Sequence, residues 1–201
     1  MKPKRTSSLI PPSEEVRSGS LRDHFLIAMP AMADGNFSEA LVYICDHSKE
    51  GAMGLVINRP MDVPLSTVFE QMQLDSSSPL DSQPLLSGGP VSVERGFVLH
   101  TGDDQSWEST MKVSPQVSLT ASRDIIADMA AGNGPSDALV VLGYAGWGAG
   151  QLEQEIADNA WLTVPADSEI IFRTPFAERN RAAAASIGVN LQHLSHSFGR
   201  A

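Results

Sequence analysis

The stretch that decides the fold reads Ala138-Leu-Val-Val-Leu-Gly-Tyr-Ala-Gly-Trp-Gly-Ala-Gly-Gln-Leu-Glu-Gln-Glu-Ile156. Residues 138–142 form an unbroken apolar run, which is typical of a buried strand. Glycines then recur at 143, 146, 148 and 150, and glycine adopts backbone conformations that are closed to other residues. Residues 151–158 predict a helix with Leu152 and Ile156 on one face. The centre of the chain is therefore predicted to be a strand, a glycine loop and a helix.

The glycine loop before a helix resembles a phosphate site, because a helix N-terminus offers free N–H groups and a partial positive charge. The residues argue against it. No Lys-Ser or Lys-Thr follows the glycines, and Gln151 stands where a dinucleotide motif would need its last glycine. Glu153 and Glu155 in the first turn would repel an anion. We interpret the glycines as a tight turn that serves sheet curvature, with Tyr144 and Trp147 packed around it.

Composition limits the function classes. With 201 residues, of which 42% are hydrophobic, the chain can bury one sizeable core. Residues 1–20 are polar and broken by prolines, so we predict a disordered leader followed by a single domain over 21–201. The net charge of -10, with only four lysines, argues against a nucleic-acid surface and against an anionic membrane surface.

The single cysteine, Cys45, excludes an intrachain disulfide and suits a reducing cytosol. The N-terminal residues lack the apolar core of a signal peptide, and no run is long enough to span a bilayer. The sequence therefore predicts a soluble, cytoplasmic protein.

Hydrophobic periodicity and turn residues predict more strands than helices. We expect strands at 24–29, 41–47, 52–58, 96–101, 161–164 and 169–172, with one or two more within 111–119. Helices are expected near 65–72, at 125–129 behind a Ser122 cap, and at 177–187, closed by Gly188. Thr67 and Glu70 suggest a capping box. Since turns join the early strands, we predict an α+β fold with a mostly antiparallel sheet flanked by a few short helices.

Polar residues at the strand ends are the candidates for ligand binding. Arg59, beside Asn58, could clamp a carboxylate or phosphate, or form a structural ion pair with one of the many acids. His100 could line a pocket or lie exposed in a turn. Gly88-Gly89 could bring backbone close to a ligand, although a bend in a strand is the favoured interpretation. The candidate ligand-binding residues are Asn58, Arg59, Gly88, Gly89, His100, Trp147 and Gln151.

Other motifs are weaker. Cys45 and His47 lie two apart on a strand and should share a face, but that spacing does not readily give a thiolate–imidazole contact, so a small buried side chain is favoured for the cysteine. His193 and His196 could share a helical face, but no third zinc ligand is near. Ser109-x-x-Lys112 matches part of a penicillin-binding motif whose remainder is missing. We therefore predict no catalytic residue, no metal site and no cofactor.

Five motifs in order give the chain a family resemblance. They are Phe25-Leu-Ile-Ala-Met-Pro30, Gly51-Ala-Met-Gly-Leu-Val-Ile-Asn-Arg-Pro60, Gly88-Gly-Pro-Val91, Gly96-Phe-Val-Leu-His100 and Leu142-Gly-Tyr-Ala-Gly-Trp-Gly-Ala-Gly-Gln-Leu-Glu153. From about Leu21 onward the chain resembles the YqgE/AlgH family of bacterial proteins. The resemblance implies an α+β fold with a coiled, split β-sheet. It supplies no reaction, and the family's label of transcriptional regulator stems from a link to alginate production.

Two functional hypotheses follow. The first is a binding or regulatory protein without catalysis, which would act on transcription through a protein partner because the negative charge disfavours direct DNA contact. The alternative is a small-molecule binding protein or an enzyme, with a pocket at the strand ends around Asn58, Arg59 and His100. The two differ in whether a concave pocket gathers these side chains. The sequence identifies no substrate, no partner and no oligomeric state.

Overall fold

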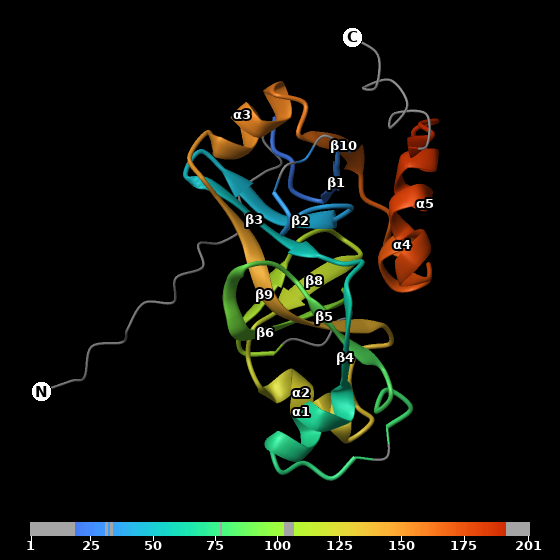
Figure 1. The fold of residues 1–201 in the computed structure, drawn as a ribbon. Helices are drawn as coiled ribbons and strands as arrows, with labels where there is room; N and C mark the ends of the chain where they lie inside the picture. Colours follow the sequence, from blue (N-terminus) through green and yellow to red (C-terminus); the bar gives the residue numbers. More distant parts are fainter. Residues whose placement is uncertain (1–18, 31, 33, 77, 103–106, 192–201) are drawn as a thin grey trace, which may run out of the picture.

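The computed structural model describes residues 19–30, 32, 34–76, 78–102 and 107–191 (Figure 1). The strands are β1 (His24–Ala28), β2 (Leu41–Ser48), β3 (Gly51–Val56), β4 (Pro60–Pro64), β5 (Pro84–Ser87), β6 (Val91–Thr101), β7 (Thr110–Lys112), β8 (Val117–Thr120), β9 (Ala138–Gly148) and β10 (Trp161–Pro165). The helices are α1 (Leu65–Gln71), α2 (Asp124–Ala130), α3 (Gln151–Ala157), α4 (Ser168–Phe172), the 3-10 helix η1 (Phe176–Glu178) and α5 (Arg179–Ser186). The predicted leader lies almost wholly outside the described residues.

Strand β9 joins two halves of one curled sheet. Its last residues pair with β3, from Gly54↔Ala145 to Gly51↔Gly148, and β2, β1 and β10 continue that half. Its first residues pair with β6 on one side and with β5 on the other, and β8, β7 and β4 complete the second half. All pairings are antiparallel except that of β5 with β9. The predicted α+β fold with a coiled, mostly antiparallel sheet is confirmed.

The predicted glycine loop is wrong, because residues 143–148 continue strand β9. Gly143 has a φ of 72°, and a Cβ there would lie 2.6 Å from the carbonyl oxygen of Gly89. Only glycine lets the strand bend at this point while another segment crosses it closely. In place of the predicted loop there is only a short turn at Gly150, which has a φ of 73°. This turn directly precedes helix α3, which was predicted.

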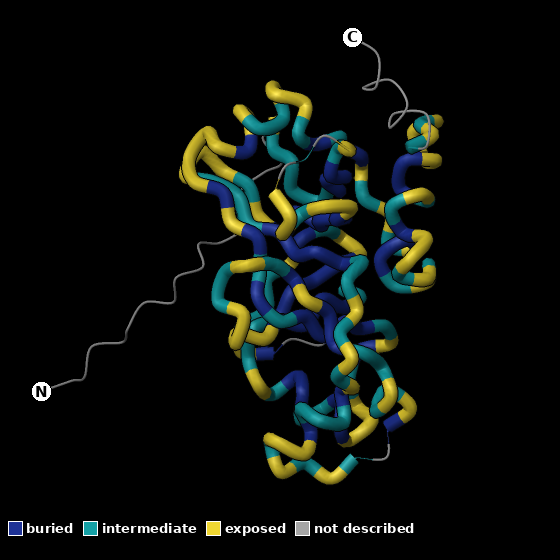
Figure 2. The backbone as a smooth tube through the Cα atoms, viewed as in Figure 1, coloured by how far each residue is buried: buried dark blue, intermediate teal, exposed yellow. Residues whose placement is uncertain are grey.

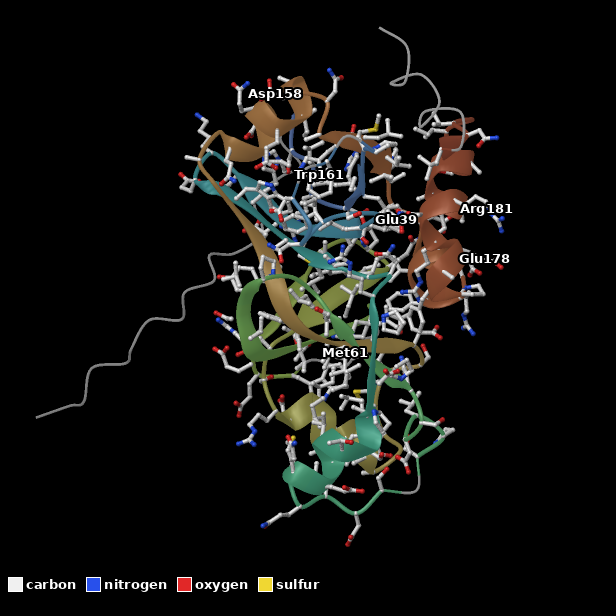
Figure 3. The ribbon with its side chains drawn as sticks, viewed as in Figure 1. Glu39, Met61, Asp158, Trp161, Glu178 and Arg181 are labelled. Carbon is white, nitrogen blue, oxygen red and sulfur yellow. The ribbon has the colours of Figure 1, made fainter. Side chains whose placement is uncertain are left out.

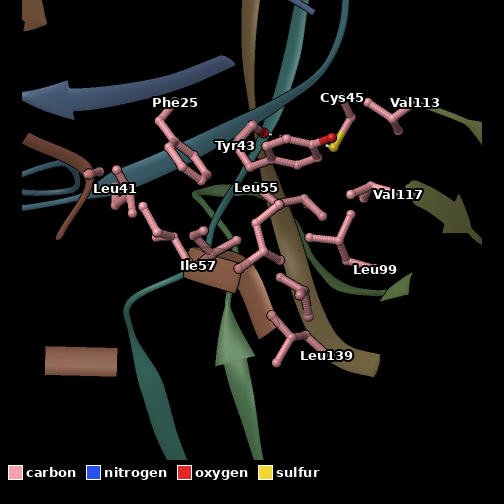
Figure 4. Packing of buried hydrophobic residues seen from close by; sticks show 14 of the residues in the cluster. Phe25, Leu41, Tyr43, Cys45, Leu55, Ile57, Leu99, Val113, Val117 and Leu139 are labelled. Atoms are coloured by element: carbon pink, nitrogen blue, oxygen red, sulfur yellow. Dashed lines mark hydrogen bonds between the residues drawn. The ribbon is translucent and has the colours of Figure 1, made fainter. Parts of the chain in front are cut away.

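Three apolar clusters cover both faces of the sheet, and Figure 2 shows that much of the backbone in the middle of the molecule is buried. The first contains residues from both halves, including Tyr43 and Leu55 from one and Leu99 and Leu139 from the other, so the curled sheet closes over a shared core (Figure 4). The second packs α1 and α2 against β5, β6 and β9. The third packs α3 against β1, β2 and β3. Burial on both faces explains the unbroken apolar runs of the central strands.

Several local predictions are confirmed. Strands β2 and β3 form the expected antiparallel hairpin. The expected strands within 111–119 are β7 and β8. Gly132 follows α2 with a φ of 77°, and Gly188 follows α5 with a φ of 75°. No helix among the described residues is long and apolar enough to cross a membrane.

Other local predictions are wrong. Residues 169–172 lie in helix α4, because the side chain of Asp167 accepts a hydrogen bond from the backbone N–H of Glu169 at 2.9 Å and caps the helix. The capping box predicted for Thr67 and Glu70 does not form, because α1 already begins at Leu65, directly after Pro64. Ser122 does not cap α2, since its hydroxyl donates to Asp124 instead.

Candidate functional site

The side chains of Asn58 and Arg59 hold the segment that precedes β2. Asn58 accepts a hydrogen bond from the backbone N–H of Leu41 and donates one to the carbonyl oxygen of Glu39, both at 2.9 Å. The guanidinium of Arg59 donates to the carbonyl oxygens of Asn36 and of Ser38, the latter at 2.6 Å. Both of these predicted ligand-binding side chains therefore form hydrogen bonds with the chain's own backbone.

Gly88 and Gly89 lie directly against strand β9. The N–H of Gly88 donates to the carbonyl oxygen of Leu142 at 2.7 Å, and a Cβ on Gly89 would lie 2.3 Å from the carbonyl group of Tyr144. The N–H of Ser87 also donates to the carbonyl oxygen of Arg59 at 3.0 Å. The structure thus brings Arg59 and the two glycines together, and the close backbone approach is made by β9. Ligand binding at these residues stays a prediction.

His100 lies elsewhere and is fully buried, so the interpretation as an exposed turn residue is wrong. One ring nitrogen lies 2.8 Å from the carbonyl oxygen of Thr101 and the other 2.8 Å from the hydroxyl of Thr120. His100 pairs with Ala138, whereas Gly88 bonds to Leu142, four residues further along β9. At about 3.3 Å per residue this separation is about 13 Å, so His100 does not share a site with Gly88.

Trp147 and Gln151 belong to a third group, which is organised by Glu155. One oxygen of this carboxylate accepts hydrogen bonds from the indole N–H of Trp147 at 2.9 Å and of Trp161 at 2.8 Å. The other oxygen accepts one from the side-chain amide of Gln151 at 2.9 Å. Figure 3 shows Trp161 beneath α3. Phe37 packs on both indoles, so this group fixes α3 to β9 and β10.

The Cys45–His47 pair does not form. A register shift between Ile44 and Asp46 is a β-bulge, which reverses the alternation and makes the shared face that we predicted wrong. Cys45 lies in the core beside Tyr43 (Figure 4), and burial raises the pKa of its thiol, which confirms its interpretation as a small buried side chain. His47 instead contacts the carboxylate of Glu153 at 2.8 Å.

Comparison with known proteins now identifies the family. Residues 25–192 match the model of the AlgH-like family. The chain belongs to this family. A UPF0301 protein of Saccharophagus degradans is 53% identical over 182 residues, which cover 90% of this chain and 89% of that protein. Another, from Thioalkalivibrio sulfidiphilus, is 53% identical over 184 residues, which cover 92% of this chain and 98% of that protein.

Solved structures agree with this placement in the AlgH-like family. The solution structure of AlgH from Pseudomonas aeruginosa superposes with a TM-score of 0.75 at 47% identity, over 94% of this chain and all of that one. A crystal structure of a protein from Corynebacterium diphtheriae gives a TM-score of 0.68 at 18% identity, over 90% of this chain and 94% of that one. The second likeness shows that the fold is shared.

The buried guanidinium of Arg179 is a feature that sequence reasoning missed. Arg179 is 2% exposed and donates to the carbonyl oxygens of Thr174 and Ile57, with the ring of Phe176 at 4.3 Å. Burial lowers its pKa to about 10. Its neighbours Glu178 and Arg181 point away from the sheet (Figure 3). An arginine in an alanine-rich helix gives no sequence signal of burial, because arginine is usually exposed.

Metal ligation finds no support in the part of the chain that the structure describes, where no three His, Cys, Asp or Glu residues are grouped to hold an ion. The histidines at 193 and 196, the weak zinc candidates, lie outside the described residues.

Proposed function

We propose that this member of the AlgH-like family is a non-catalytic binding protein with a regulatory role, which acts in the cytoplasm through a protein partner and makes no direct contact with DNA. One observation carries the proposal: the polar side chains expected to do chemistry are bonded into the fold. Asn58, Arg59 and Gln151 each make two hydrogen bonds, and His100 is buried with both ring nitrogens engaged. Such groups position backbone, and a substrate would have to compete with the contacts that they already make.

Charge supports a protein partner over DNA. The chain carries 24 acidic and 14 basic residues, so its field repels a phosphate backbone and attracts a basic protein surface. DNA binding draws most of its affinity from clustered Lys and Arg side chains on phosphates. The regulatory part of the proposal rests on the family's label.

The test joins partner identification to a DNA-binding assay. Tagged protein is cross-linked in cells, a captured protein is identified by mass spectrometry, and the complex is rebuilt from the two purified proteins. We expect a defined complex, and no change in the fluorescence anisotropy of labelled promoter DNA at about 0.15 M salt. Saturable, sequence-specific DNA binding at that salt would overturn the proposal.

A small-molecule site remains the second candidate, and the bonds that bring Arg59 beside Ser87 and Gly88 favour it. A ligand there would have to compete with two backbone carbonyl oxygens for the guanidinium. Screening by thermal shift, with the Arg59→Lys variant as the control, tests this candidate. A compound that stabilises the wild type and not the variant would support it.

A further inference from the structure

The connection between helix α2 and strand β9 contains Asn133-Gly134, the only place in the chain where a glycine follows an asparagine. Helix α2 packs with α1 against the sheet at one end of the molecule (Figure 1). Gly132 ends the helix with a φ of 77°, and the backbone N–H of Asn133 donates to the carbonyl oxygen of Asp128 at 2.8 Å. The backbone of Asn133 is therefore held at the end of α2.

The side chain of Asn133, in contrast, is held by nothing in the part of the chain that the structure describes. It is exposed and forms no hydrogen bond there. Two other asparagine side chains are fixed to distant backbone, since those of Asn58 and Asn180 both donate to the carbonyl oxygen of Glu39. The amide of Asn133 is thus free to rotate.

The backbone nitrogen that follows an asparagine can attack the side-chain amide, which makes asparagine a thermolabile residue. At Asn36 and Asn159, which are also exposed, the next N–H is engaged and donates to a carbonyl oxygen at 3.0 Å and 2.9 Å, respectively. The N–H of Gly134 has no such partner among the described residues. Because glycine has no Cβ, this nitrogen can also approach the side chain of Asn133 with little steric hindrance.

The fold requires the glycine at position 134. A Cβ there would lie 2.7 Å from a side-chain carbon of Met129 and 3.0 Å from its Cα. Met129 is 1% exposed and belongs to the second apolar cluster, so it cannot move aside without disturbing the core. Packing therefore fixes the residue that makes Asn133 reactive.

We propose that Asn133 is a site of spontaneous modification, at which the folded protein converts asparagine to aspartate and isoaspartate. The nitrogen of Gly134 loses its proton to hydroxide and attacks the side-chain amide carbon of Asn133, which closes a five-membered succinimide ring and releases ammonia. Water then opens the ring. Cleavage at the side-chain carbonyl carbon gives aspartate, and cleavage at the main-chain carbonyl carbon gives isoaspartate. The balance is one water consumed and one ammonia released, and the inference does not depend on the proposed function.

Both products disturb the end of α2. Each adds a negative charge beside carbonyl groups whose partial charge is also negative, and α2 has no basic residue in its last turn to offset it. Isoaspartate also lengthens the backbone by one methylene group directly before Gly134, which is already packed tightly against Met129. The aged protein should therefore unfold at a lower urea concentration than the fresh protein.

The test incubates the full chain at mildly alkaline pH and physiological temperature. Trypsin then releases residues 124–173 as one peptide that contains both Asn133 and Asn159, because no Lys or Arg lies between its ends. Mass spectrometry with electron-transfer fragmentation assigns the conversion to one asparagine and separates isoaspartate from aspartate. We expect conversion at Asn133 and none at Asn159, after subtraction of any conversion in a sample digested without incubation.

The matched control is Asn133→Gln, which keeps an exposed amide but would have to close a larger ring. This variant should lose the conversion and should unfold at the same urea concentration as the fresh wild type. An isoaspartyl methyltransferase with labelled S-adenosylmethionine gives a second readout, in which the aged wild type should take up label and the aged variant should not. Unchanged Asn133 in the folded protein, or equal conversion at Asn133 and Asn159, would overturn the inference.

Discussion

Replacing Gly89 by alanine should strongly destabilise the protein, because this residue lies where the β5–β6 connection crosses strand β9. The added Cβ would lie 2.3 Å from both the carbonyl carbon and oxygen of Tyr144 and 2.5 Å from the nitrogen of Ala145. All three are backbone atoms of a strand that is hydrogen-bonded on both sides, so none can move without breaking pairs. The φ of Gly89 is 149°, a conformation that L-residues rarely adopt.

Two contributions set the magnitude. Inserting a methyl group into a packed region costs about 1–3 kcal/mol, and the fixed backbone of β9 places this case at the upper end. The unfavourable φ costs about another 1–3 kcal/mol. Together they lower the free energy of unfolding by about 4 kcal/mol. For a chain of this size the melting temperature should fall by about 10 °C.

Urea unfolding followed by tryptophan fluorescence measures this loss. The matched control is Gly96→Ala, in which the new Cβ would meet only a side-chain carbon of Leu142, at 3.8 Å. We expect the control to change the free energy of unfolding by less than about 0.5 kcal/mol. If Gly89→Ala were no more destabilising than the control, the close approach would not be structural, and a ligand would again be the better explanation of the glycine pair.

Four other residues give shorter tests. Glu155→Ala should lower the free energy of unfolding by about 3 kcal/mol, because two largely buried indole N–H groups lose their acceptor, and Glu155→Gln should lose less than half of that in the same urea assay. Arg179→Ala should cost about 3 kcal/mol and speed hydrogen exchange in α5, since two carbonyl oxygens lose their donor; unchanged exchange would contradict this. The Cys45 thiol should react with Ellman's reagent only in denaturant, because burial raises its pKa; rapid reaction of the folded protein would refute this. For Asp124, partial burial favours the neutral form, but hydrogen bonds from Ser122 and from backbone N–H groups outweigh it and hold the pKa below its ordinary value. Asp124→Asn should therefore be less stable than the wild type at pH 7, and the difference should disappear as the pH falls through the lowered pKa; a constant difference in urea midpoints between pH 7 and pH 2 would oppose this.

Local sequence patterns correctly predicted the elements whose structure depends mainly on residues that are close together in the chain. Apolar runs identified β1 and β2, the short turn identified the β2–β3 hairpin, and glycines identified where α2 and α5 end. The errors arose where a distant segment decides the local structure. Glycine-rich sequence usually indicates a loop, yet residues 143–148 stay in a strand because β3 pairs with them from a hundred residues earlier. Strand β4 was missed because prolines at both ends suit only an edge strand, and it pairs with β5 alone.

The candidate site shows the same division between local and distant information. Residue type suggested that Arg59 would bind a carboxylate or phosphate or form an ion pair, and that Asn58 would help to bind a ligand. The acceptors that these side chains have are backbone carbonyl oxygens some twenty residues away, on a loop that periodicity cannot place. Glu155 was noticed only as a charge that would repel phosphate, since nothing local indicates that Trp161 folds back onto it. The pair of Gln151 with Glu155 alone had a readable signal, because residues four apart on a helix are neighbours.

These assignments change where function should be sought. If the glycines of the central stretch serve the crossing of the chain's own strands, and the strand-end polar groups hold the loops beside that crossing, both sets belong to the fold. The shared fold at 18% identity with the Corynebacterium diphtheriae protein indicates that the fold itself survives extensive change of side chains. Specific recognition then depends on exposed groups that the fold does not need. Variants of such exposed groups should therefore separate binding from stability, whereas variants at Arg59 or Gly89 should lose both together.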